Sequence, residues 1–458
     1  MNIRNFHNIH LTGIGGISMS AIAQILHSKK HIITGTDDNA SPIIDKLKNL
    51  GIHISTNHNP DFIKNADLVV FSSAISPSHP DLLLAQKLGK PTLDRAVFLG
   101  MLASNYHNTI AVSGTHGKTT TTAMLDCIFN TALLRPTTHI GGIMHHNSAN
   151  YSLGTKKFFI TEACEYNRNI LHLHPNTAII TNIQAEHMDC YHDYSDLVNT
   201  FLQFTHQTQD LIILNGDTLD KSTFRPTKGQ TLLTFGFEPH NTCYPANIIS
   251  NAGKYIFDCI YQGKNLGQIR LNLYGQHNIL NALACIIASI YYNIHFSIIQ
   301  SALANFTGVN RRFDILATTP NTIIHDYAHH PTEIKNAITT ALSINKGKLH
   351  TIFEPHTYSR TLTLMPEFST AFGDTDYLYI LPTYPSREMP LLGGDAIDLF
   401  YNVLSSTPNT TYCQHPEALF HTLDNIIQPN DTILFLGAGT IDTIAHRYHT
   451  RHNTPPTH

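Results

Sequence analysis

Short apolar runs alternate with amphipathic segments from the start of the chain, which is the pattern of strands and helices in a parallel α/β sheet. The first apolar runs are 8–13, 31–37 and 68–73, and the segments 17–27 and 42–50 between them have helical spacing. The pattern predicts a Rossmann-like domain over residues 1–105.

The same alternation restarts twice. Near residue 105 a second series begins, with β-branched apolar runs that have the composition of buried parallel strands. Its runs are 108–113, 158–161, 177–182 and 210–215, and shorter alternating runs with Gly and Asn turns over 231–274 predict a small antiparallel patch. A third series has apolar runs at 348–353, 377–381 and 432–437. We therefore expect an α/β chain with a central parallel-sheet domain over 106–311 and a Rossmann-like C-terminal domain over 312–458.

The sequence Gly-Thr-His-Gly-Lys-Thr at 114–119 follows the apolar run 108–113 and precedes a predicted helix at 120–129. Glycines let backbone N–H groups approach phosphate oxygens, and a helix N-terminus favours an anion. The spacing is shorter than in the usual P-loop, because Val112 lies five residues before Gly117. Lys118 would then contact the terminal phosphates, and the Thr119 hydroxyl would hold Mg²⁺. The predicted contacts to ATP or GTP are Gly114, Thr115, His116, Gly117, Lys118, Thr119 and Thr120.

The first predicted strand also ends in a glycine turn, Gly13-Ile-Gly-Gly-Ile-Ser18. This turn is close to the dinucleotide fingerprint, and Asp37 follows roughly 20 residues later, but Ser18 replaces the third glycine. An NAD-dependent oxidoreductase is one reading of this turn. Because a second phosphate loop follows, we instead assign the turn to the phosphates of a nucleotide-bearing substrate.

Two further strand ends carry candidate metal ligands. Glu162 follows the run 158–161, and His187 follows the run 177–182. The carboxyl ends of parallel strands meet at one edge of a sheet, so both could lie near Thr119. Two Mg²⁺ ions would help Lys118 bring a second anion to the γ-phosphate. Alternatively, Glu162 and Glu165 are solvated loop carboxylates and His187 is incidental in a chain with 31 histidines.

The third domain offers candidates at comparable places. Asp326 and Tyr327 follow an apolar run, and Tyr327 could stack on a base. His329 or His330 could face the reaction centre, or both could simply occupy a helix start. Arg360 follows another strand end, and the pair at 311–312 could bind phosphates or be linker charge.

Composition narrows the possible partners. The net charge of −4 gives no basic footprint for nucleic acid. No apolar run approaches the roughly 18 residues of a membrane helix, and the first residues lack a signal peptide's apolar region. Seven scattered cysteines without a CxxC pair indicate a reducing compartment. We expect a soluble cytoplasmic protein that is a monomer or a weak homodimer.

Taken together, the motifs resemble the Mur ligases of bacterial peptidoglycan synthesis over about residues 7–440. The motifs that carry the resemblance are 13–16, 114–119, 162–165, 181–183 with 186–189, 275–278 with Asn281, 308–313, 326–333 and 355–360. The resemblance implies three domains. The first binds a UDP-sugar, the central one binds ATP, and the C-terminal one closes over the site. Within the family, the motifs are most similar to those of the branch that adds L-alanine to the lactyl carboxylate of UDP-N-acetylmuramate through an acyl phosphate.

The resemblance also implies roles for individual residues. Thr119 and Glu162 would hold one Mg²⁺, and His187 would help to hold a second. Lys118 would steady the γ-phosphate, and His330 and Arg360 would orient the carboxylates of the two substrates. The residues implied around adenine, ribose and phosphates are Asn281, Arg312, Asp326 and Tyr327. The residues implied around uridine and diphosphate are Gly15, Gly16, Ser18, Asp37, Ser72, Ser73 and Arg95.

Two departures from related ligases affect these implications. Several sibling ligases place a carbamylated lysine after the His187 motif, but no lysine occurs here between Gln184 and Lys221. The alanine-adding branch also lacks it. Many members carry Arg where Thr357 stands, so Arg360 would contact the carboxylate alone. Two alternative readings remain. One is a recycling ligase that attaches a ready-made tripeptide, and the other is a non-catalytic nucleotide-binding switch.

Overall fold

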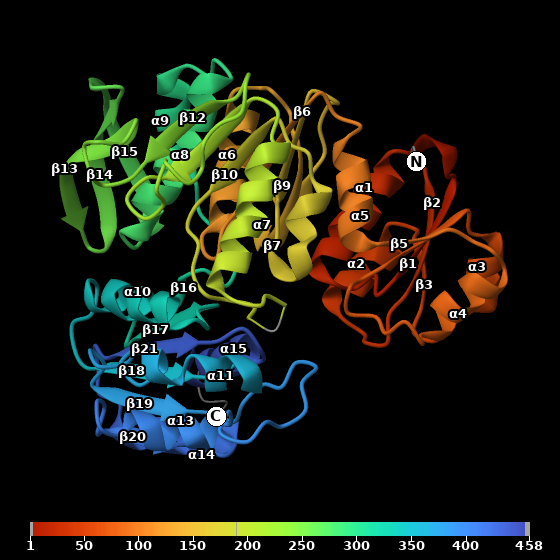
Figure 1. The fold of residues 1–458 in the computed structure, drawn as a ribbon. Coiled ribbons are helices and arrows are strands. Elements are labelled where there is room, and N and C mark those ends of the chain that lie inside the picture. The colour runs from red at the N-terminus through yellow and green to blue at the C-terminus, as the bar shows by residue number, and fades with distance from the viewer. Residues whose placement is uncertain (1–2, 189, 454–458) are drawn as a thin grey trace. The chain divides into compact units, whose positions relative to one another are not determined.

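The computed structural model describes residues 3–188 and 190–453, which form three sheets covered by helices (Figure 1). The chain packs into two compact units. The first comprises residues up to Asn247 with Phe257–Arg270 and Ile279–Val309, and the second comprises Ile248–Ile256, Leu271–Asn278 and the chain from Asn310 onward. The predicted three-domain α/β fold is confirmed, whereas the boundaries near residues 105 and 311 stay predictions.

The first sheet is parallel, with strand order β3-β2-β1-β4-β5. Its strands are β1 (Asn8–Thr12), β2 (Ile32–Thr36), β3 (His53–Ser55), β4 (Leu68–Phe71) and β5 (Thr92–Asp94). Its helices are η1 (Ile3–Asn5), α1 (Ile17–Ser28), α2 (Pro42–Asn49), α3 (Pro60–Asn65), α4 (Pro80–Lys87) and α5 (Arg95–Ala103). The strand order reverses between β1 and β4, and ligands bind α/β sheets outside the carboxyl ends at such a point.

The second sheet has ten strands in the order β15-β14-β13-β12-β11-β10-β6-β9-β7-β8. Its strands are β6 (Asn108–Ser113), β7 (Thr137–Met144), β8 (Ala149–Ser152), β9 (Phe158–Glu162), β10 (Thr177–Ile180), β11 (Leu211–Asn215), β12 (Thr231–Phe235), β13 (Cys243–Asn251), β14 (Lys254–Tyr261) and β15 (Lys264–Tyr274). The helices are α6 (Lys118–Thr131), η2 (Tyr166–His172), α7 (Tyr194–Gln207), α8 (His277–Tyr291) and α9 (Phe296–Asn305). Strand β6, which leads into the phosphate loop, lies between β9 and β10 and runs parallel to both.

The antiparallel patch predicted over 231–274 is smaller than expected, because β12 pairs in parallel with β11. A second antiparallel pair, β7 with β8, lies at the other end of the strand order. Strands β13, β14 and β15 are consecutive neighbours joined by two-residue turns. Both residues of each turn have positive φ, with values of 46° and 74° at Ala252 and Gly253 and of 49° and 76° at Gln262 and Gly263. Such turns connect antiparallel strands.

The third sheet has the order β16-β17-β21-β18-β19-β20, and only the β16–β17 pair is antiparallel. Its strands are β16 (Asp314–Ala317), β17 (Thr322–Asp326), β18 (Leu349–Phe353), β19 (Tyr377–Ile380), β20 (Thr410–Tyr412) and β21 (Thr432–Leu436). Its helices are α10 (Pro331–Leu342), α11 (Tyr358–Thr363), α12 (Met365–Phe368), α13 (Ala396–Val403), α14 (Pro416–Ile426) and α15 (Ile441–Asn453). A separate apolar core lies on each face of this sheet.

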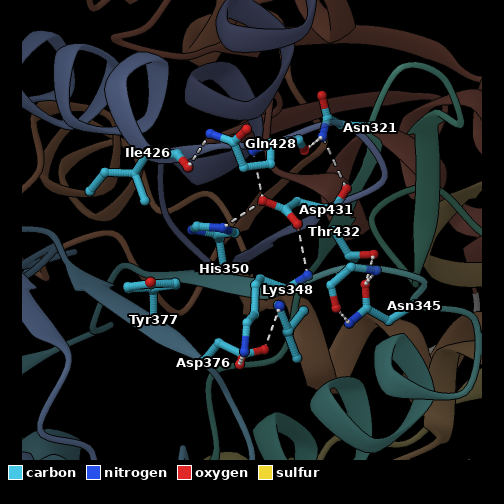
Figure 2. Close-up of polar contacts among 12 residues, drawn as sticks. Asn321, Asn345, Lys348, His350, Asp376, Tyr377, Ile426, Gln428, Asp431 and Thr432 are labelled. Carbon is cyan, nitrogen blue, oxygen red and sulfur yellow. Dashed lines mark hydrogen bonds and ion pairs between the residues drawn. The ribbon is translucent and has the colours of Figure 1, made fainter.

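A polar network fixes the amino-terminal ends of β18 and β21 (Figure 2). The Asp431 carboxylate accepts hydrogen bonds from the backbone N–H groups of Lys348 at 2.7 Å and Gln428 at 2.8 Å. It also pairs with Nε2 of His350 at 3.2 Å. Both Asp431 and His350 are buried, so the carboxylate gives the His350 ring a partner inside the protein.

Within residues 3–188 and 190–453, no helix combines the length and the apolar character needed to span a membrane.

Candidate active site

The predicted phosphate loop directly follows β6, but α6 begins at Lys118 and not at the predicted residue 120, so Lys118 and Thr119 lie in the first turn of the helix. Gly114 and Gly117 have φ values of 125° and 85°, which side-chain-bearing residues rarely adopt. A Cβ at Gly114 would lie 2.2 Å from Oγ1 of Thr181, and one at Gly117 would lie 2.6 Å from Oδ1 of Asn281. Gly117 is also the N-cap of α6 and has no side chain to cap its N–H groups. The loop therefore requires both glycines and leaves the helix N-terminus available to an anion.

The segment after β10 holds this loop in place. Asn182 accepts from the N–H groups of Thr115 and His116, at 3.1 Å through its carbonyl and at 3.0 Å through its side-chain oxygen. The N–H of Gln184 donates to Oγ1 of Thr115 at 2.8 Å. Asn182 and Gln184 had no individual role in the sequence prediction, since only the folded sheet brings them to the loop. Thr120 lies in the first turn of α6, next to the predicted metal ligand Thr119.

Lys118 turns back over the loop. Its ammonium lies 3.0 Å from each carboxylate oxygen of Glu165 and 3.1 Å from the Thr115 carbonyl, and it also donates to the Gly114 carbonyl. Burial alone would lower the pKa of Lys118, but the Glu165 charge outweighs it and raises the pKa. Lys118 therefore remains a cation at neutral pH, as contact with phosphate requires.

Glu162 and Thr119 each approach one of two adjacent glycines of β7. The Glu162 carboxylate accepts from the Gly141 N–H at 2.6 Å. A Cβ at Gly142 would lie 3.0 Å from Cγ2 of Thr119. The structure thus places the predicted pair beside one glycine dipeptide, and a hydroxyl and a carboxylate are ligands that Mg²⁺ accepts.

His187 lies with a different group of acids. Ligand atoms of Glu165, Glu186 and His187 all lie within 4.8 Å of one another, and Nε2 of His187 is 3.7 Å from Oε1 of Glu165. Glu165 is 1% exposed, so the alternative reading of this residue as a solvated loop carboxylate is wrong. Glu186, which is 8% exposed, was missed as a candidate although it directly precedes His187. Buried carboxylates beside an imidazole form a donor set that suits a divalent cation.

The first sheet brings its predicted residues to the point where the strand order reverses. Gly15 donates its N–H to Oδ2 of Asp37 at 2.8 Å. Arg95 donates to Oγ of Ser18 at 3.2 Å, from the start of α5 to the first turn of α1. Three further predicted residues lie nearby. Gly16 is the N-cap of α1, a Cβ at Gly13 would lie 3.3 Å from Cβ of Ser72, and Ser73 donates to Asp94 at 2.9 Å.

In the second unit, Asp326 and Tyr327 lie at the end of β17. Asp326 accepts from the N–H groups of Phe313 and Ala328, each at 2.7 Å. Burial raises the pKa of Asp326 to about 6, although the positive charge of Arg312 opposes the shift. The guanidinium of Arg312 lies 5.0 Å from the centre of the Tyr327 ring and 3.8 Å from the Glu333 carboxylate.

The two remaining predicted residues occupy helix starts. His330 is the N-cap of α10, and its Nδ1 accepts from the Thr332 N–H at 3.3 Å. Arg360, in α11, donates to Nδ1 of His356 at 2.9 Å. Burial, together with the charges of His329 and Arg360, lowers the pKa of His356 to about 3. His356 is therefore a neutral acceptor that orients Arg360.

Known proteins resemble this chain along nearly its whole length. Models of the Mur ligase family catalytic domain, the Mur ligase middle domain and the Mur ligase glutamate ligase domain match residues 8–107, 112–289 and 311–439. The UDP-N-acetylmuramate–L-alanine ligase of Acetivibrio thermocellus is 37% identical over 441 residues, covering 95% of this chain and 94% of that protein. The ligase of the same name from Clostridium beijerinckii is 38% identical over 448 residues, covering 96% and 97%.

Solved structures give the same result. The UDP-N-acetylmuramate–alanine ligase of Thermotoga maritima superposes with a TM-score of 0.82 at 26% identity and covers 97% of this chain and 99% of that one. A murein peptide ligase from Psychrobacter arcticus shares the fold, with a TM-score of 0.73 at 21% identity and coverage of 96% and 98%. The chain therefore belongs to the Mur ligase family.

Proposed function

We propose that this chain is an ATP-dependent ligase that joins L-alanine to the lactyl carboxylate of UDP-N-acetylmuramate in cytoplasmic peptidoglycan precursor synthesis. The observation that carries this proposal is the edge where β6, β9 and β10 end. There one lysine, buried carboxylates and a histidine surround a glycine loop. This arrangement suits phosphoryl transfer between two anions, and the names of the full-length relatives supply the substrates.

The reaction follows from these groups. An oxygen of the lactyl carboxylate attacks the γ-phosphorus of ATP, and the bond from that phosphorus to the bridging oxygen breaks, so that ADP leaves. Lys118 offsets the charge that gathers on the phosphate oxygens. The amine of L-alanine then attacks the acyl carbon, inorganic phosphate leaves, and the amine proton is lost to a base or to solvent.

Thr119 and Glu162 would hold one magnesium ion, and Glu165, Glu186 and His187 would hold a second. Bound magnesium supplies positive charge that neutralises phosphate oxygens. The choice of Glu165 and Glu186 adds two ligands to the set implied by the sequence. It also offers a physical reason why no carbamylated lysine is needed beside His187.

The other predicted residues complete the substrate contacts in this proposal. Gly15, Gly16, Ser18 and Arg95 bind the diphosphate at the N-terminus of α1, with Asp37, Ser72 and Ser73 beside them. Asn281, Arg312, Asp326 and Tyr327 contact ATP, and His330 and Arg360 orient substrate carboxylates. Family membership disfavours the oxidoreductase and switch readings, and the recycling ligase remains the rival because it shares this fold.

The deciding experiment measures phosphate release from ATP with UDP-N-acetylmuramate and Mg²⁺. We expect release only when an amino acid is added, with L-alanine preferred over glycine and serine. Lys118→Ala should lower kcat by at least about 100-fold, since it removes a charge that stabilises the transition state, and should leave UDP-N-acetylmuramate binding nearly unchanged. Lys156→Ala, at an exposed lysine, is the matched control and should behave as wild type.

Two results would contradict the proposal. Phosphate release that is indifferent to the acceptor would exclude amide synthesis. Faster release with a tripeptide than with L-alanine would favour the recycling ligase.

A further inference from the structure

His139 is a buried histidine on β7 that no motif of the sequence singled out. It is 3% exposed and is the direct register partner of Thr161 on β9, so both side chains lie on the same face of the second sheet. Its ring nitrogens contact two different segments of the first unit. Nε2 lies 2.8 Å from Oγ of Ser18 on α1, and Nδ1 lies 3.0 Å from Oγ1 of Thr161.

These contacts belong to a hydrogen-bond chain with a single direction. At one end Thr161 donates its hydroxyl proton to the Glu162 carbonyl at 3.0 Å, so its oxygen must accept from Nδ1–H of His139. Nε2 of this tautomer is an acceptor, so Ser18 donates its proton to it. The Ser18 oxygen in turn accepts from Arg95, which can only donate, at 3.2 Å.

The chain requires a neutral imidazole. Burial and the nearby charge of Arg95 lower the pKa of His139 to about 3, so the ring stays uncharged at physiological pH. A protonated ring would lose its acceptor at Nε2 and would repel Arg95. The neutral ring instead leaves Arg95 as the positive charge of this cluster.

We propose that His139 is a positioning residue for the sugar nucleotide. Through Ser18 it holds the Arg95 guanidinium ready for the anionic diphosphate, and through Thr161 it joins that site to the strand end that carries Glu162. The inference rests on the proposed function, because Ser18 and Arg95 are assigned there to the diphosphate.

The test combines steady-state kinetics with calorimetric binding of UDP-N-acetylmuramate alone. His139→Leu should raise both KM and Kd for the sugar nucleotide about tenfold, the effect of losing one net hydrogen bond. The KM values for ATP and L-alanine and the kcat should stay within about twofold of wild type. His139→Gln can place an amide near the position of Nε2 and should recover most of the affinity, whereas His139→Asn, whose amide lies near Nδ1, should recover less.

Two further variants separate positioning from general packing. Ser18→Ala, at a partly exposed position, should reproduce the His139→Leu defect, and combining the two should add little, because they break the same chain. Asn150→Ala removes hydrogen bonds from β8 to Ile17 and Ser20 of α1 without touching His139. It should lower Tm but change the Kd for the sugar nucleotide by less than about threefold.

Equal defects in Asn150→Ala and His139→Leu would overturn the inference, because both would then act by loosening α1. Wild-type affinity in His139→Leu or in Ser18→Ala would overturn it as well. If the wild-type protein itself does not bind UDP-N-acetylmuramate, the proposed function fails instead.

Discussion

Asp81, at the start of α4, is a buried carboxylate that connects several strands of the first sheet. Its side chain is 0% exposed, and Oδ2 accepts from Thr12 at 3.1 Å and from Thr36 at 2.5 Å. These threonines end β1 and β2, directly before Gly13 and Asp37. His10 and His58 also bond to the same carboxylate. Asp81 therefore fixes the end of β1, which carries the glycine turn, and the end of β2, which carries Asp37.

The pH dependence of stability tests this role. Burial alone would raise the pKa of Asp81, but hydrogen bonds from His10, Thr36 and His58 outweigh it and lower the pKa well below its usual value. A lowered folded-state pKa gives stability that is present at neutral pH and lost as pH falls below about 4. Asp81→Asn should lose about 2 kcal/mol at pH 7 and show a shallower decline in acid, measured by urea unfolding from pH 7 to pH 2.

The control for Asp81 is Asp61→Asn, at an exposed carboxylate on the neighbouring helix α3. We expect it to unfold like wild type across the same pH range. An acid decline in Asp81→Asn as steep as that of wild type would show that this carboxylate does not carry the effect.

Candidate site residues could be proposed where the chemistry is local in the sequence. Gly114 to Thr119 are contiguous, so their spacing alone suggested a phosphate site. Glu165 could not be recognised as buried, because its environment comes from Tyr191, which donates to its carbonyl, and from Lys118. His139 had no local signal, since its partners Ser18 and Thr161 are distant in sequence.

At the scale of elements, apolar runs predicted the buried central strands well and the edges of the sheet poorly. Strands β6, β9, β10 and β11 were all expected from their β-branched runs. Strands β7 and β8 were not, since the Gly-Gly pair of β7 and the polar residues of β8 interrupt any alternation. The missed strand β7 carries both His139 and the glycines beside Glu162, so the element without a pattern contributes much of the candidate site.

The network at the ends of β18 and β21 gives a test at this scale. Asp431→Ala leaves the buried ring of His350 without its acceptor, and it removes the same acceptor from the half-buried N–H groups of Lys348 and Gln428. Buried groups that lose partners cost about 1–3 kcal/mol each, so we expect a loss of about 3 kcal/mol in the free energy of unfolding. Chemical denaturation followed by circular dichroism measures it.

Asp424→Ala serves as the comparison, because it removes a more exposed ion pair between Asp424 on α14 and Arg451 on α15. Such pairs contribute less than about 1 kcal/mol. Similar losses in Asp424→Ala and Asp431→Ala would mean that the network does not stabilise the strand ends.

At the scale of the whole molecule, a strand–helix alternation that begins at the start of the chain and restarts twice predicted three sheets. The strand orders were not predictable, since local patterns do not say which parallel strands become neighbours. The division into compact units was not predictable either. Residues Ile248–Ile256 and Leu271–Asn278 lie in the second unit although they come from the middle of the chain.

Hydrogen exchange with single ligands tests the substrate assignments across the molecule. UDP-N-acetylmuramate alone should slow exchange in segments 13–18 and 72–95 of the first unit and leave 312–330 unchanged. A nonhydrolysable ATP analogue with Mg²⁺ should slow exchange in 114–120 and also in 312–330, because Arg312, Asp326 and Tyr327 are assigned to ATP. Exchange in 312–330 that ignores the analogue would remove these residues from the ATP site.

The crowding around the phosphate loop limits how this chain could evolve resistance to an inhibitor. Gly114 and Gly117 combine positive φ with space that Thr181 and Asn281 already fill. Any larger residue there would disturb the loop to which we assign ATP, so mutants that escape a drug at these positions should also lose fitness. Few substitutions at these two glycines would leave the loop intact, so a compound that contacts them should select few resistant variants.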